Sequence, residues 1–197
     1  MVNSHRRGSG GHLRAWTILV AGAALLVTAC STNSATGPST AGPTVSASET
    51  TSAAPTTVST ADEARQQATA AYIGMWQAMA KAGVTSDWQS PDLAKYATGD
   101  ALGVISRSLY TDHLNGVVTK GAPTNNPQVS SVDPSGDPTT VMISDCGDST
   151  NSLKYKDGHL LNDTPGGKRA ITAEVKKQPD RAWRVTRFAV EGLGSCA

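Results

Sequence analysis

Residues 60–83 are TADEARQQATAAYIGMWQAMAKAG, and the organisation of the folded part of the chain follows from this stretch. Thr60 and Glu63 match the S/T-x-x-E pattern of a helix capping box. Apolar residues then recur at helical spacing until Gly83, a typical stop, and they are Ala64, Ala68, Ala71, Tyr72, Met75, Trp76 and Met79. We therefore predict a helix of about five turns whose single apolar face must pack against another layer.

Two further helices are expected before residue 116. Ser90 followed by Pro91 is typical of a helix start, with Ser as the cap and Pro in the first turn, and predicts a short helix through about Ala97. The pattern of residues 100–115 predicts a third helix, which ends at Gly116. Its apolar stripe consists of Leu102, Ile105, Leu109 and His113.

After Gly116 the hydrophobic period changes from helical spacing to alternation. Ile171, Ala173 and Val175 alternate with polar residues, as in a sheet with one buried face. Short strands separated by Pro, Gly and Asp turns are predicted at 117–120, 128–132, 139–145, 153–155, 170–177 and 183–190. Helices first and antiparallel strands second predict the α+β class.

This layout resembles the nuclear transport factor 2-like fold, a curved antiparallel sheet wrapped on three helices to form a cone. The resemblance covers residues 62–197. It is also similar to small exported lipoproteins of high-GC Gram-positive bacteria. The shared features are Tyr72-x-x-x-Trp76, Ser90-Pro91-Asp92-Leu93, Val141-x-x-x-Asp145-Cys146-Gly147-Asp148 and a carboxyl-terminal Cys196. The resemblance implies a pocket inside the cone, which some members of the fold use for acid–base chemistry and others only for binding.

The amino terminus predicts export. Arg6, Arg7 and Arg14 precede an apolar run, 15–29, that is shorter than the roughly 20 residues a membrane-spanning helix needs. The run ends in Val-Thr-Ala before Cys30 and resembles a bacterial lipobox, which implies a diacylglycerol thioether on Cys30 and cleavage before it. We predict a signal peptide at 1–29 and a lipid anchor on the outer face of the cytoplasmic membrane; an ordinary signal peptide containing a cysteine is the alternative.

Residues 30–61 are expected to form a tether. After Cys30 the segment is almost entirely Ser, Thr, Ala, Pro and Gly, and Glu49 is its only charged residue before position 62. Such a composition has too little apolar surface to offset the entropy of ordering. It suits O-glycosylation, although an unmodified spacer fits equally well. The folded domain is predicted at 62–197.

The cysteine count predicts one disulfide. If Cys30 carries lipid, Cys146 and Cys196 remain in an exported domain, where two thiols most simply pair with each other. A metal site would need further ligands, and neither His113 nor His159 has ligand-like spacing to a cysteine. No metal or cofactor is expected.

Several residues are candidates for a functional site. Asp145 ends an apolar strand, and His113 carries an imidazole, the side-chain type best suited to proton transfer near neutral pH, so either could act as a general base. A cavity could be lined by Tyr72, Trp76, Trp88 and Tyr110. Simpler alternatives are a turn role for Asp145, core packing for the aromatic residues and a surface position for His113.

Composition excludes some classes of function. From Cys30 onward there are 14 Lys and Arg against 16 Asp and Glu, and the basic residues are scattered, so a nucleic-acid partner is not expected. Lys168 and Arg169 are interpreted as strand-end charges.

Our first hypothesis for the function is a non-catalytic domain that binds a small apolar ligand or an envelope protein. The alternative is a small isomerase- or cyclase-type enzyme, and a third hypothesis is an accessory domain whose pocket is filled by its own side chains.

Overall fold

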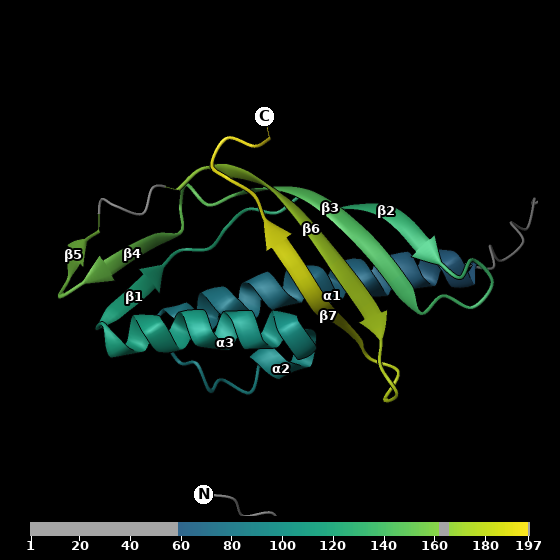
Figure 1. Cartoon of the computed structure of the whole chain (residues 1–197), viewed down its shortest axis with the longest axis horizontal. Coiled ribbons are helices and arrows are strands. Elements are labelled where there is room, and N and C mark those ends of the chain that lie inside the picture. The colour runs from purple at the N-terminus through teal and green to yellow at the C-terminus, as the bar shows by residue number, and fades with distance from the viewer. Residues whose placement is uncertain (1–58, 162–165, 197) are drawn as a thin grey trace, which may run out of the picture. The chain divides into compact units, whose positions relative to one another are not determined.

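The structure, a computed structural model, describes residues 59–161 and 166–196 of the 197-residue chain. The predicted signal peptide, Cys30 and nearly all of the tether lie outside the described residues. Within the described ranges the helices come first and are α1 (Thr60–Gly83), α2 (Leu93–Tyr96) and α3 (Gly99–Leu114). The strands follow along the chain, and Figure 1 shows the longest of them running across the helices, so the α+β prediction is confirmed.

The helix α1 begins one residue earlier than the capping box predicts. The cap is Ser59, whose side-chain oxygen accepts a hydrogen bond from the Asp62 backbone N–H at 3.1 Å. Asp62 and Glu63 stand in the first turn and Lys81 in the last, as the helix dipole favours. The predicted apolar face is buried, with Tyr72 and Ala68 fully inaccessible to solvent.

The helix α2 is shorter than expected. Ser90 does not cap it; the backbone carbonyl of Ser90 instead accepts the Leu93 N–H in a turn, and the helix begins after Asp92. The short piece is held through Leu93, which is 2% exposed, and Ala97, which is 1% exposed. Packing of these two side chains, rather than a strong cap, keeps this single turn in place.

Two antiparallel sheets follow α3. The order in one sheet is β1-β4-β5 and in the other β2-β3-β6-β7, and Figure 1 shows the second sheet crossing the helices. Their strands are β1 (Val117–Lys120), β2 (Gln128–Asp133), β3 (Thr140–Asp148), β4 (Leu153–Lys156), β5 (His159–Leu160), β6 (Lys168–Lys177) and β7 (Trp183–Val190). The prediction missed β5, because a two-residue strand has no readable period.

The helices cover one face of the larger sheet. Val141 and Ile143 of β3 pair in register with Val175 and Ala173 of β6, and all four are at most 2% exposed. They pack on the apolar face of α1 and on the buried side of α3, which includes Ile105. The alternation predicted at 171–175 therefore marks the helix-facing side of the sheet.

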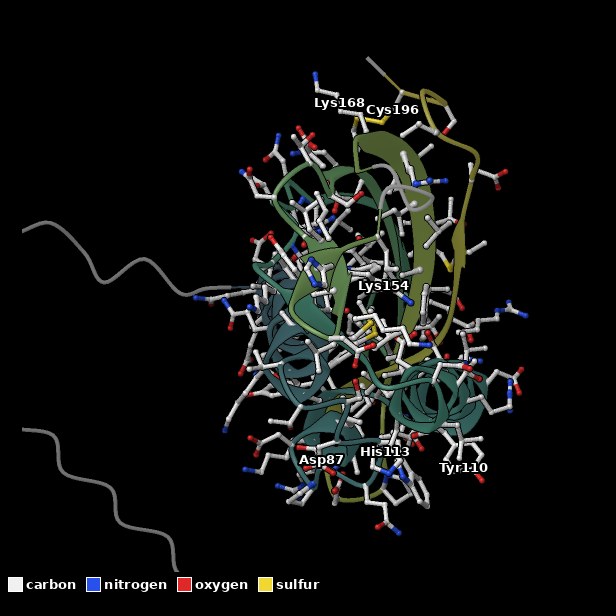
Figure 2. All side chains as sticks on the ribbon, turned by 90° about the vertical axis from the view of Figure 1, so that its left-hand side faces the viewer. Asp87, Tyr110, His113, Lys154, Lys168 and Cys196 are labelled. Carbon is white, nitrogen blue, oxygen red and sulfur yellow. A yellow bond between two sulfur atoms is a disulfide. The ribbon has the colours of Figure 1, made fainter. Side chains whose placement is uncertain are left out.

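Cys146 and Cys196 are joined by a disulfide, in agreement with the cysteine count. Their Cα atoms are 5.8 Å apart, and the bond ties the carboxyl-terminal segment to β3. Figure 2 shows Cys196 next to Lys168, at the start of β6. None of the helices in the described ranges is both long and apolar enough to cross a membrane.

Candidate functional site

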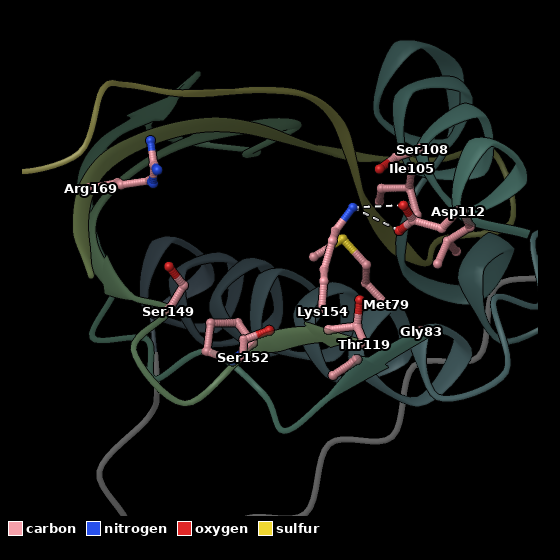
Figure 3. Close-up of a pocket in the computed structure, with 13 residues that line it drawn as sticks. Met79, Gly83, Ile105, Ser108, Asp112, Thr119, Ser149, Ser152, Lys154 and Arg169 are labelled. Carbon is pink, nitrogen blue, oxygen red and sulfur yellow. Dashed lines mark hydrogen bonds and ion pairs between the residues drawn. The ribbon is translucent and has the colours of Figure 1, made fainter. Parts of the chain in front are cut away.

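A cleft of about 220 Å³ opens between α1, α3, β1, β4 and the start of β6. It is lined by Met79, Ala80, Gly83, Ile105, Ser108, Leu109, Asp112, Thr119, Pro123, Ser149, Ser152, Lys154 and Arg169 (Figure 3). At roughly 30 Å³ per water molecule, this volume equals about seven waters. The cleft is therefore large enough for a small ligand.

One side of the cleft is apolar because of helical periodicity. Met79 extends the buried face of α1 by one further turn, and Ile105 and Leu109 lie four residues apart on α3. Ile105 is 1% exposed and Leu109 is 4% exposed, so the protein holds both in fixed positions. Together these side chains form a rigid hydrophobic wall.

An ion pair closes one end of the cleft. Nζ of Lys154 on β4 donates to both carboxylate oxygens of Asp112 on α3, at 2.7 and 2.9 Å. Asp112 is one of few buried charged residues in the described ranges, and its side chain is 12% exposed. Each charge satisfies the other, as partly buried charges require.

Arg169 stands across the cleft from this ion pair, as Figure 3 shows. It lies on the helix-facing side of β6, two residues before the buried Ile171 and opposite Gly147 of β3. Nη1 of Arg169 donates to the backbone carbonyl of Glu191 at 3.3 Å. Among the described residues, no carboxylate lies within ion-pair distance of Arg169, so the cleft lining carries one net positive charge.

Hydroxyl groups surround the remaining part of the cleft. Oγ of Ser149 donates to the Gly167 carbonyl at 3.1 Å, so its proton is already used. The side chains of Ser108, Thr119 and Ser152 make no hydrogen bond to another residue in the described part of the chain. Their hydroxyls are available to donate to a ligand or to water.

The structure places Asp145 outside the cleft. Its carboxylate accepts hydrogen bonds from the Tyr72 hydroxyl at 2.9 Å, the Asn125 amide nitrogen at 2.6 Å and the Asn126 backbone N–H at 2.9 Å. Asp145 is 7% exposed. Burial, together with the adjacent Asp145 charge and the hydrogen bond to it, raises the pKa of Tyr72 well above its ordinary value. This cluster joins α1 to β3 and presents no group to the cavity.

The aromatic candidates also lie elsewhere. Trp76 is 9% exposed and packs edge-to-face against Tyr72, at 6.2 Å between ring centroids, and against Phe188, at 5.7 Å. Trp88 and Tyr110 form a similar pair at 5.2 Å, and Tyr110 is 44% exposed. Tyr72 and Trp76 belong to the core, whereas Trp88 lies before α2, partly buried, and packs on Tyr110 at the surface of α3. None of the four residues lines the cleft.

His113 is exposed near the end of α3, and Figure 2 shows it beside Tyr110, away from Cys196. The sequence predicts His113 on the apolar stripe of α3, but Asp112 is the buried residue in that turn. The two are adjacent in sequence, so about 100° of helical rotation separates them. The structure therefore does not bring His113 and Asp145 together.

Three of the residues that line the cleft were missed or misread. Arg169 lies two residues before Ile171 and is therefore on the same face of the strand. This spacing could have predicted from the sequence that Arg169 faces the helices. Asp112 follows Ile105 by seven residues and continues the same stripe. Lys154 had no such signal, because its pairing with Asp112 depends on how β4 packs beside α3.

No family model and no curated protein matches the chain.

The described ranges contain no group of three or more His, Cys, Asp and Glu side chains that could hold a metal ion.

Solved structures show distant likenesses. The intermembrane space region of the chloroplast protein ARC6 is 16% identical over 64% of this chain and 94% of its own, with a TM-score of 0.37. A protein from Catenulispora acidiphila is 13% identical over 66% and 91%, with a TM-score of 0.40. A ketosteroid isomerase-like protein from Erwinia carotovora atroseptica is 10% identical over 64% and 92%, with a TM-score of 0.39. Likenesses at these values carry no argument about what this chain does.

Proposed function

We propose that this chain is a lipid-anchored protein of the cell envelope whose folded domain binds a small ligand in the cleft without transforming it. The observation that carries the proposal is the cleft itself, which combines a rigid apolar wall with hydroxyl and guanidinium donors. A few oriented polar groups on an apolar lining are the usual composition of a ligand pocket. An open cleft of about 220 Å³ also disfavours the hypothesis of a pocket filled by the protein's own side chains.

A binding role fits the cleft better than catalysis. Proton transfer needs an acid or base that can reach the substrate. The carboxylate that lines the cleft in the described structure is Asp112, and Lys154 holds both of its oxygens. Asp145 and His113 do not line the cleft, so neither supports an isomerase or cyclase reaction there.

The proposed location rests on two independent features. The basic residues, the apolar run and the small residues before Cys30 match a lipoprotein signal. The disulfide between Cys146 and Cys196 is of the kind found in oxidising compartments. A lipid on Cys30 and a Ser/Thr-rich tether would then hold the domain outside the cytoplasmic membrane.

The binding proposal can be tested by NMR with the isotope-labelled full chain. A panel of small neutral and charged molecules is expected to shift the backbone amides of Gly83, Thr119 and Ser152, which line the cleft. Ser108→Phe, at an exposed position on the cleft rim, should abolish these shifts. The matched control is Val104→Phe, which lies one turn earlier on α3, is 45% exposed and does not line the cleft. Shifts that survive Ser108→Phe, or that occur only elsewhere, would contradict the proposal.

A further inference from the structure

The charged residues that line the cleft leave one positive charge unpaired, and this charge is on Arg169. Lys154 and Asp112 neutralise each other through two short contacts. Arg169 has only a 3.3 Å hydrogen bond to a backbone carbonyl, from Nη1, and no carboxylate partner in the described ranges. Its other guanidinium donors are therefore available on the side facing the cleft.

We infer that the ligand of this cleft is a small monocarboxylate whose carboxyl group binds Arg169 and whose short apolar chain lies against Met79, Ile105 and Leu109. This inference rests on the proposed binding function and specifies its ligand class. A planar guanidinium matches a carboxylate through two parallel N–H···O bonds, whereas a neutral head group would leave the charge unbalanced.

The neighbouring groups support an anionic head group. The hydroxyls of Thr119 and Ser152 have unused protons. These two hydroxyls can donate to an anion but offer no negative charge to attract a cation. A dianion would exceed the single net positive charge of the lining.

The apolar wall and the volume of the cleft limit the size of the apolar part of the ligand. Ile105 and Leu109 present no hydrogen-bonding groups, so an alkyl or aromatic body gains from contact with them. A volume equal to about seven water molecules accommodates a chain of roughly six carbons within the lining, and a much longer chain would extend out of the cleft into solvent. Hexanoate is therefore a suitable probe.

The test compares three probes of nearly equal size, namely hexanoate, 1-hexanol and hexylammonium, by NMR titration of the full chain at neutral pH. Hexanoate should shift the amides of Gly83, Thr119 and Ser152 at about tenfold lower concentration than hexanol, as the loss of one charge-assisted hydrogen bond implies. Hexylammonium should bind more weakly than hexanol. Added salt should weaken only hexanoate binding, because Arg169 is partly exposed.

Two variants test whether Arg169 is the residue that makes the cleft prefer hexanoate to hexanol. Arg169→Gln should lower hexanoate affinity about tenfold and leave hexanol unchanged, since it removes the charge and keeps most of the side-chain length. The matched control is Lys168→Gln, which removes the same charge one residue away on the exposed, opposite side of β6 (Figure 2). It should leave hexanoate affinity unchanged. The amide spectrum of each variant also shows whether it is folded.

The outcomes separate the two proposals. Equal binding of hexanoate and hexanol, with no effect of Arg169→Gln, would overturn the carboxylate inference and leave the binding function standing. If none of the three probes shifts the cleft amides while the spectrum shows a folded protein, the carboxylate inference fails. The broader panel under "Proposed function" then decides whether the cleft binds ligands of another kind.

Discussion

The hydroxyl of Tyr72, on α1, donates a 2.9 Å hydrogen bond to the carboxylate of Asp145, which lies 73 residues later on β3. Both residues are buried, and the bond crosses from the helix layer to the sheet. Asn125 and the backbone of Asn126 supply the other donors to the same carboxylate. Three donors satisfy the oxygens of this buried carboxylate, and the arrangement fixes how α1 lies against β3.

Tyr72→Phe should destabilise the domain. The variant leaves the Asp145 carboxylate buried with one donor fewer, which costs about 1–3 kcal/mol of unfolding free energy. Urea denaturation followed by circular dichroism measures the change. Tyr110→Phe is the control, because Tyr110 is 44% exposed, and its loss of the hydroxyl should change stability by less than about 0.5 kcal/mol. Equal stability of both variants would show that the bond contributes nothing.

The same hydroxyl predicts how stability depends on alkaline pH. Burial and the Asp145 charge raise the pKa of Tyr72 above its ordinary value of 10.0, so the folded state retains this proton when the unfolded chain has lost it. The stabilising contribution is therefore complete below about pH 10 and declines as the pH rises above the unfolded value. Urea denaturation between pH 9 and 11 should show a steeper loss of stability in the wild type than in Tyr72→Phe. Parallel curves for the two proteins would contradict this assignment.

The amphipathic pattern of α1 was sufficient to predict which residues this helix contributes to the core. Tyr72, Met75 and Trp76 are buried as their spacing indicates. The exact start at Ser59 was not predicted, because adjacent Ser and Thr residues can both cap a helix and local geometry decides between them. The length of α2 depended on contacts made by Leu93 that no local pattern encodes.

The cleft was harder to predict than the core. The aromatic candidates were proposed to line a cavity, yet large side chains fill the core and leave open space where Gly83, Ser149 and Ser152 stand. Arg169 and Asp112 each occupy a position in an apolar pattern, and a charged residue at such a position is the more informative signal. The pairing of Asp112 with Lys154, 42 residues away, arises only from tertiary packing.

Gly121→Ala should destabilise the domain strongly. Gly121 follows β1 with φ of +83°, and a Cβ atom there would overlap the backbone carbonyl oxygen of Asn151. Left-handed strain costs about 1 kcal/mol for a residue with a side chain, and displacement of the 149–152 turn adds to it, for a total of about 2–4 kcal/mol. Thermal unfolding measures the effect. The control is Gly136→Ala, where a Cβ atom meets nothing within 4 Å; a similar loss there would refute the steric explanation.

Replacing both Cys146 and Cys196 by Ser should lower the free energy of unfolding. The bond closes a loop with a sequence separation of 50, and chain entropy assigns about 4 kcal/mol to a loop of this length. Urea denaturation with and without reductant provides the measurement. Reductant should destabilise the wild type to the level of the double variant and leave the variant unchanged. A wild type insensitive to reductant, with both thiols free, would contradict the disulfide.

Cys30→Ala should release the protein from the membrane or leave it unprocessed. Two acyl chains on one residue hold a protein stably, whereas a spacer without lipid has no apolar group to do so. Fractionation of bacterial cells, combined with labelling by a radioactive fatty acid, follows both properties in the wild type and the variant. Ser34→Ala, in the Ser/Thr-rich segment after Cys30, should leave labelling and fractionation unchanged. If Cys30→Ala protein were still labelled and membrane-bound, Cys30 would not be the site of the anchor.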